Sequence, residues 1–306
     1  MNEIIYTVII PHKNIPDLLR RCLDSIPERD DIQIIIVDDS SDEDKVNFKT
    51  FPGLDRKNTE IYFTKENRGA GYARNVGLKH AKGKWLVFAD ADDFFMPCFS
   101  EALDKYKDDE NDIIYFHVTG CHSDTMKYYP CDVKYINRLL SKIKRTNNWD
   151  LAVSVTLPWG KLIKRNMVEN YNIMFQEVRY ANDVFFSVRT AVAADKKTVS
   201  DYVFYCYTYR AGSLTKWDNL TKEDSLNQLL VRYQVLSDAD YYLKSIGKKP
   251  YLYLFSIGYM LRTVGTDRKL FITMTLKFIK QYGLWLFIIG IPVRIYRKIK
   301  KQCFKN

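Results

Sequence analysis

The chain has 306 residues, of which 46% are hydrophobic and 27% are charged. This composition allows a sizeable core and excludes disorder over most of the length. The formal net charge is +10, which fits a nucleic acid, an anionic membrane or a phosphorylated substrate as a partner.

The first 118 residues alternate short apolar runs with amphipathic segments, and this pattern predicts alternating strands and helices. The expected strands are residues 6–11, 32–37, 61–64, 85–89 and 113–118. The expected helices are residues 16–25, 70–80 and 97–106, and Gly83 follows the second as a C-terminal glycine would. Apolar strands separated by helices indicate an α/β fold with a mostly parallel central sheet covered on both faces.

The rest of the chain is less regular. Residues 159–167 lead into a helix, residues 183–194 have a helical pattern, and residues 199–209 form a tyrosine-rich strand. From about Trp217 onward the pattern is helical. We therefore expect three parts: residues 1–118, residues 119–216 and a helical C-terminal region of residues 217–306.

Polar clusters stand where the predicted strands end. Asn14 follows the first strand, Asp38 and Asp39 follow the second, and a group of acidic residues follows the fourth. Ligands of open α/β sheets bind at the carboxyl ends of the strands. A ligand site is therefore expected at this edge.

The acidic group after the fourth predicted strand consists of Asp90, Asp92 and Asp93. Like charges so close together repel each other. A divalent metal that bridges a diphosphate would relieve this repulsion, because Mg²⁺ and Mn²⁺ prefer oxygen ligands and Mg²⁺ commonly combines one or two carboxylates with phosphates. A solvated acidic turn that caps the next helix is the alternative.

For two further segments, Asp38-Asp39 and residues 68–75, both a binding role and a purely structural role are possible interpretations. Asp38 and Asp39 could accept hydrogen bonds from a ribose or a base, or cap a following helix. In residues 68–75 the glycines allow close backbone approach to a ligand, and Arg74 could meet a phosphate. An ordinary helix start explains that segment equally well. The sequence G-x-x-x-x-G-K-[ST] does not occur, which excludes a P-loop ATPase.

Four segments in a set order resemble the family 2 glycosyltransferases of GT-A fold. They are VIIPHKN (residues 8–14), IIIVDDSSD (34–42), NRGAGYARNVGL (67–78) and WLVFADADD (85–93). More loosely, PWGKLIKRNMV (158–168), YANDVFFSVR (180–189) and YRAGSLT (209–215) resemble acceptor-half segments of bacterial members that build surface polysaccharides. Residues 217–306 carry no such resemblance.

The resemblance implies a role for individual residues. Pro11 and Asp39 would lie by the nucleotide base, commonly uracil, with Asp38 beside them, and Arg74 would lie near the phosphates. Asp90 and Asp92 would form the D-x-D motif that binds Mn²⁺ or Mg²⁺, with Asp93 next to them. The expected nucleotide-binding set is Pro11, Asn14, Asp38, Asp39, Arg74 and Asp90, and the expected metal set is Asp90, Asp92 and Asp93.

Asp183 matches the second acid of the family's E-D pair, which is usually taken as the catalytic base. The residue before it is Asn182, where glutamate is common in the family. A base in this place would take the proton of an acceptor hydroxyl as that hydroxyl attacks the anomeric carbon. Family members invert the anomeric configuration, and the same is expected here. A helix N-cap is the structural alternative for Asp183.

The resemblance thus predicts a donor-binding half (1–118), an acceptor-binding half (119–216) and a helical C-terminal region. It predicts an inverting transferase that moves a sugar from a nucleoside diphosphate sugar, commonly a UDP-sugar, to a glycan or lipid-linked acceptor in bacterial surface polysaccharide synthesis. A sugar-nucleotide pyrophosphorylase and an inactive nucleotide-binding scaffold are the alternatives. No specific nucleic-acid partner is expected, because the motifs of such proteins are missing.

The C-terminal end combines an apolar block with a cationic one over residues 283–304. This pattern fits a segment at a membrane interface with basic side chains facing anionic lipid, and it also fits a core helix with a solvated tail. No apolar run approaches the roughly 20 residues of a spanning helix, and no secretory signal is seen. We therefore expect a cytoplasmic protein or one peripheral on the cytoplasmic face of the inner membrane, attached through its basic C-terminus.

Overall fold

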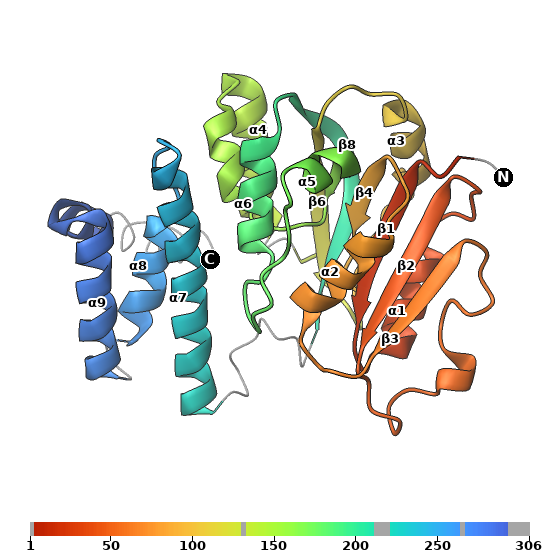
Figure 1. Cartoon of the computed structure of the whole chain (residues 1–306), viewed down its shortest axis with the longest axis horizontal. Helices are drawn as coiled ribbons and strands as arrows, with labels where there is room; N and C mark the ends of the chain where they lie inside the picture. Colours follow the sequence, from red (N-terminus) through yellow and green to blue (C-terminus); the bar gives the residue numbers. More distant parts are fainter. Residues whose placement is uncertain (1–2, 130–132, 211–220, 264–266, 293–306) are drawn as a thin grey trace. The chain divides into compact units, whose positions relative to one another are not determined.

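The computed structural model describes residues 3–129, 133–210, 221–263 and 267–292. The chain forms two compact units, residues 1–213 and 214–306. Strands occur in the first unit, and the described part of the second is helical (Figure 1). The division of the first unit into donor and acceptor halves stays a prediction.

Eight strands of the first unit form one sheet in the order β3-β2-β1-β4-β7-β6-β8-β5. In chain order they are β1 Tyr6–His12, β2 Ile32–Asp39, β3 Thr59–Thr64, β4 Trp85–Phe88, β5 Phe94–Phe95, β6 Ile113–His122, β7 Lys161–Lys164 and β8 Lys197–Tyr209. Neighbours from β3 to β4 are parallel, as are β6 and β8, whereas β7 and β5 are antiparallel to their neighbours. The expected mostly parallel sheet is confirmed.

Helices cover both faces of this sheet. They are α1 Pro16–Asp24, α2 Ala70–His80, α3 Phe99–Tyr106, α4 Val133–Thr146, α5 Arg165–Asn170 and α6 Val184–Ala193, with short 3₁₀ turns at Phe48–Thr50 and Trp149–Ser154. In Figure 1, α2 crosses in front of β1 and β2, and α1 lies behind them. Helix α4 was not expected, yet its buried stripe of Ile136, Leu140 and Ile143 has the spacing of an amphipathic helix.

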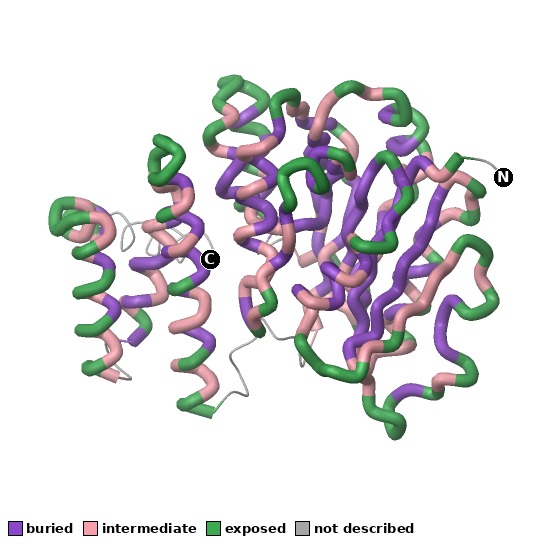
Figure 2. The backbone as a smooth tube through the Cα atoms, in the orientation of Figure 1, coloured by how far each residue is buried: buried purple, intermediate pink, exposed green. Residues whose placement is uncertain are grey.

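The core of the first unit lies along β1, β2 and β4, whose residues are all buried (Figure 2). Gly83 is part of this packing. A Cβ atom at Gly83 would lie 2.6 Å from the backbone nitrogen of Thr7, and the Gly83 N–H donates to Thr7 Oγ1 at 2.8 Å. The residue that follows α2, Ala81, has an extended backbone. Gly83 therefore allows close packing against β1 and does not form a left-handed helix cap.

The described part of the second unit contains four helices: α7 Lys222–Ser245, α8 Tyr253–Thr263, α9 Arg268–Tyr282 and a further helix, Leu284–Pro292. Its core contains Tyr233, Ile257, Met260, Met274 and Phe278. The helical C-terminal region is confirmed for the described ranges 221–263 and 267–292. The rest of the expected basic segment, residues 293–304, lies outside the described residues. Among the helices described, none alone meets the length and hydropathy of a membrane span, although α9 and Leu284–Pro292 meet them jointly across a bend of 116°.

Candidate active site at the carboxyl ends of the strands

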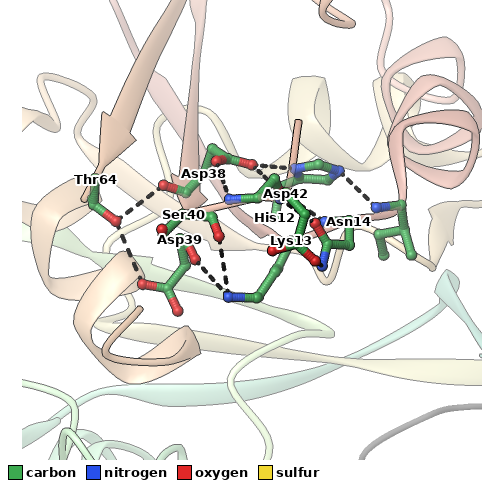
Figure 3. Close-up of polar contacts among 10 residues, drawn as sticks. His12, Lys13, Asn14, Asp38, Asp39, Ser40, Asp42 and Thr64 are labelled. Atoms are coloured by element: carbon green, nitrogen blue, oxygen red, sulfur yellow. Dashed lines mark hydrogen bonds and ion pairs between the residues drawn. The ribbon is translucent and has the colours of Figure 1, made fainter. Parts of the chain in front are cut away.

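The ends of β1 and β2 are joined by His12 and Asp38, both buried (Figure 3). His12 Nδ1 lies 2.7 Å from Asp38 Oδ2, and the Ile15 N–H donates to His12 Nε2 at 3.2 Å. Because Nε2 accepts, Nδ1 of a neutral ring carries the proton and donates to Asp38. Burial alone would raise the pKa of Asp38, but hydrogen bonds from His12 and Ser41 outweigh it and hold that pKa below its usual range. Asp38 therefore fixes the loop after β2 as an ionised carboxylate.

Asp39 holds the loop that precedes α2. Its carboxylate accepts the backbone N–H groups of Arg68 at 3.0 Å and Gly69 at 2.6 Å. No α-helix follows Asp39 before β3, so the helix-cap interpretation of Asp38 and Asp39 is wrong. Both residues instead organise backbone around the strand ends, and their contact with a nucleotide stays a prediction.

Lys13 adds a cation at this edge that was not expected. Its Nζ donates to the carbonyls of Asp39 and Ser40 at 3.2 Å (Figure 3). It also donates to Asn67 Oδ1 at 2.7 Å. The neighbouring Asn14 has a left-handed backbone with φ 59° and exchanges two hydrogen bonds with Asp42. The position of Lys13 in the H-K-N sequence, directly after the last residue of β1, could have indicated this role.

Pro11 belongs to the strand that carries this loop. It is buried within β1 and lies opposite Val37 of β2. Its neighbours therefore place it in the sheet just before the strand ends, and its expected position by a nucleotide base stays a prediction.

Arg74 connects two distant parts of the site. It is buried on α2, and its Nη2 lies 2.5 Å from Asp90 Oδ1 just after β4. Its Nη1 donates to Asn182 Oδ1 at 2.8 Å, just before α6. One guanidinium thus joins the D-x-D segment to the segment of Asp183, although these segments are far apart in the sequence. The sequence alone gave no sign of the Asn182 contact.

Asp92 faces a second arginine. Arg210 Nε donates to Asp92 Oδ2 at 2.7 Å, and the Asp92 carbonyl accepts from Arg21 and from Thr208 Oγ1, both at 2.5 Å. Burial and the nearby charge of Asp90 raise the pKa of Asp92 despite Arg210. The loop is therefore fixed through its backbone, while its carboxylates crowd one another.

Asp93 is buried and holds β8. Its Oδ2 accepts from the hydroxyl of Tyr205 at 2.8 Å, and its Oδ1 accepts from the Thr208 N–H at 2.6 Å. Burial, followed by the charges of Asp92 and Asp90, raises the pKa of Asp93 well above its usual range. The structure gives Asp93 a role in tying the acidic loop to β8, and its place in the metal set stays a prediction.

Asp183 stands at the N-cap position of α6, yet its side chain makes no capping hydrogen bond. Its carboxylate acts electrostatically on Lys161 of β7, a buried cation whose Nζ donates to the Val155 carbonyl at 2.9 Å. The N-terminal end of α6 favours the ionised form of a carboxylate. The structural alternative therefore describes the position of Asp183 but not the hydrogen bonding of its side chain.

The acidic loop fits a divalent metal only together with a ligand. In the described ranges, no three His, Cys, Asp or Glu residues are grouped so that they could hold a metal ion. Asp90 and Asp92 offer carboxylate oxygens that remain partly exposed, and Mg²⁺ sites with one or two carboxylates are completed by substrate phosphates and water. The residues present are thus compatible with a metal that arrives with a diphosphate.

Comparison with known proteins identifies the family. The sequence model described as glycosyl transferase family 2 matches residues 7–171. The chain belongs to glycosyltransferase family 2. All four of the segments that predicted this family lie within the match, and so does the more distant PWGKLIKRNMV segment.

Several curated glycosyltransferases are similar to this family member. Glycosyltransferase GlyA of Streptococcus pneumoniae is 28% identical over 257 residues, covering 78% of this chain and 35% of GlyA. The putative glycosyltransferase EpsH of Bacillus subtilis is 26% identical over 216 residues, covering 69% and 62%. The poly(ribitol-phosphate) beta-glucosyltransferase of Bacillus spizizenii is 28% identical over 221 residues, covering 67% and 32%. The chain spans less than two thirds of each relative.

Solved structures confirm the GT-A fold. Residues 1–349 of S. aureus TarS in complex with UDP-GlcNAc match with a TM-score of 0.63 at 19% identity, covering 90% of this chain and 81% of that one. The mannosyltransferase PcManGT of Pyrobaculum calidifontis, in complex with GDP-Man and Mn²⁺, matches with a TM-score of 0.56 at 17% identity, covering 100% and 89%. At these identities the likeness concerns the fold alone.

Lys161 supplies a prediction about stability and pH. Burial lowers the pKa of Lys161 to about 7, although the charge of Asp183 acts to raise it. A lysine in the unfolded chain has a pKa of about 10.4. Between these values the unfolded chain binds more protons, so this group makes the free energy of unfolding rise with pH, by up to roughly 1.4 kcal/mol per unit. Urea unfolding of the wild type and Lys161→Met, at about pH 7 and about pH 8, should show this rise only in the wild type. Equal slopes in both proteins would contradict the prediction.

Proposed function

We propose that this family 2 member is an inverting glycosyltransferase whose donor is a nucleoside diphosphate sugar, with UDP-sugars first among the candidates. Its acceptor would be a hydroxyl of a glycan or lipid-linked glycan in bacterial surface polysaccharide synthesis. The observation that carries the proposal is the double contact of Arg74, which joins the D-x-D residue Asp90 to Asn182 beside Asp183. Arg74 thus supports the proposal by linking a residue proposed for the metal-diphosphate site to the neighbour of the proposed base.

The roles follow from the chemistry of each side chain. Asp90 and Asp92 would hold Mn²⁺ or Mg²⁺, which when bound offsets negative charge on the departing diphosphate. Arg74 and Arg210 pair with these carboxylates and keep positive charge beside the place of the phosphates. Asp183 would take the proton from the acceptor hydroxyl.

The nucleotide itself would lie at the ends of β1 and β2. The proposed contacts come from the edge formed by Pro11, Asn14, Asp38 and Asp39, which the hydrogen bonds of His12 and Lys13 hold in place. A preformed edge of this kind lowers the entropy lost when a ligand is ordered. Asp93 would act with the metal residues by fixing their loop to β8.

The alternatives gain no support from the described residues. A pyrophosphorylase and an inactive scaffold were the other interpretations of the same sheet. Asp90, Asp92 and Asp183, the acids required for transfer, are all present, and Asp183 is not used as a side-chain cap. We also propose that the enzyme works at the cytoplasmic face of the membrane, attached peripherally through its C-terminal part.

Calorimetric titration of UDP into the full chain, with and without Mn²⁺, tests the donor site. Binding that strengthens at least roughly tenfold with the metal is expected, because Asp90 and Asp92 would hold the metal and the metal would supply positive charge for the diphosphate. GDP, CDP and dTDP serve as matched competitors that identify the base. A protein that binds none of the four nucleotides in either condition would not have the proposed function.

A further inference from the structure

The helix Leu284–Pro292 is apolar on both of its sides. One side packs on the core of the second unit through Leu286, Phe287 and Ile291. Gly290 lies so close to α8 that a Cβ atom there would be 2.2 Å from Ile257 Cδ1. This side is therefore an ordinary buried face, and the helix is firmly seated on the unit.

The other side of the same helix is exposed and equally apolar. It consists of Leu284, Trp285, Ile288 and Ile289, of which Trp285 is 71% exposed. Their spacing places all four on one helical face. Single exposed apolar side chains are ordinary, but a group of this kind marks an interaction site.

Helix α9, which ends just before this helix, also has exposed apolar side chains. Ile272 and Leu276 are both more than half exposed, and their i, i+4 spacing places them on one face. Exposed lysines Lys269, Lys277 and Lys280 occur on the same helix. We name Ile272, Leu276, Leu284, Trp285, Ile288 and Ile289 together the C-terminal apolar face.

The net positive charge of the chain comes from its C-terminal sequence. The protein has 47 lysines and arginines and 37 aspartates and glutamates. Ten of these basic residues and none of the acidic ones occur in residues 268–306, so residues 1–267 hold equal numbers of both. The entire net charge of +10 therefore belongs to the sequence that carries the C-terminal apolar face and its continuation.

We propose that the C-terminal apolar face docks on the surface of an anionic phospholipid bilayer. Apolar side chains with a tryptophan enter the interface, and lysines and arginines bind anionic headgroups. A second copy of the chain is a poorer occupant, because two such faces would bring only positive charges together and the remaining 267 residues offer no net negative charge. This deepens the peripheral location proposed above without depending on sugar transfer.

Co-flotation of the full chain with phosphatidylcholine vesicles, with and without phosphatidylglycerol, tests the docking. Binding is expected with phosphatidylglycerol and should weaken in high salt. Trp285→Glu and Ile272→Glu should each lower the affinity for the vesicles by about tenfold or more, because each removes an exposed apolar side chain that docking would bury in the bilayer interface. Tyr241→Glu is the matched control, because Tyr241 is 67% exposed on α7 of the same unit but lies outside the face.

Three results would overturn the proposal. One is no binding to phosphatidylglycerol vesicles, and another is an equal loss in the Tyr241→Glu control. The third is a dimer in analytical ultracentrifugation that Trp285→Glu dissociates, which would assign the face to a second copy. UDP titration of the same variants separates this proposal from the proposed function: if vesicles bind but no nucleotide does, docking stands and the transferase assignment falls.

Discussion

Asp92→Asn should lower kcat/KM for sugar transfer by roughly a thousandfold and remove the benefit of Mn²⁺ for UDP binding. The substitution keeps the shape of the side chain but removes the charge that a metal needs. Arg210 can still donate to the amide oxygen in the place of the carboxylate. Initial rates at saturating metal, together with UDP titrations in Mn²⁺ and in EDTA, measure both effects.

The stability of this variant separates function from folding. Burial and Asp90 raise the pKa of Asp92, which means that its negative charge costs the folded state free energy. Asp92→Asn should therefore leave the thermal midpoint unchanged or raise it, even as activity falls. Asp55→Asn, at an exposed carboxylate in the loop between β2 and β3, is the control and should leave both quantities unchanged. A fully active Asp92→Asn enzyme would refute the metal role.

Much of the fold of residues 1–118 could be predicted because its signals are local. The runs of β1, β2 and β4 are short, largely apolar and buried throughout, which is the pattern of parallel strands. The polar residues that follow them had to share one edge once the strands were parallel. Asn14, Asp38 and Asp90 are found at that edge for this reason.

The remaining features depend on contacts that no local pattern records. Strand β5 has two residues and β7 has four, too few for a periodicity, and they exist because β8 and β6 offer them partners. The bonds from Asp93 to β8 join residues more than a hundred positions apart. The burial of Lys161 is equally hidden, since a lysine normally indicates an exposed position.

Asn182 illustrates how a departure from the family pattern acquires a physical meaning. The E-D pair of family 2 glycosyltransferases commonly has glutamate in this place, whereas in this chain the neutral amide of Asn182 contacts Arg74 Nη1. Of its two partners, Asp90 and Asn182, only Asp90 therefore forms an ion pair with Arg74. If Arg74 binds the diphosphate as proposed, it would have more positive charge available for it than a guanidinium paired with two carboxylates.

Asp183→Asn should lower kcat by about 10²–10⁴, the range that a general base contributes, while UDP affinity in Mn²⁺ stays within about twofold of the wild type. Asparagine is as good an N-cap as aspartate, and the Asp183 side chain makes no capping hydrogen bond. The substitution therefore removes the proposed proton acceptor without removing a capping hydrogen bond. Single-turnover rates with a UDP-sugar donor and UDP titrations measure the two quantities.

Asn182→Ala provides the comparison for the Asp183 variant, because it changes the neighbouring residue and removes the hydrogen bond to Arg74 but leaves the base. It should raise the KM for the donor more than it lowers kcat, because the proposed role of Arg74 is to bind the phosphates of the donor. If Asp183→Asn instead kept its kcat and lost thermal stability, the carboxylate would be structural and another group would have to accept the proton. If both variants lost kcat equally with unchanged KM, Arg74 and Asp183 would act as one unit, and the base would depend on the D-x-D segment for its position.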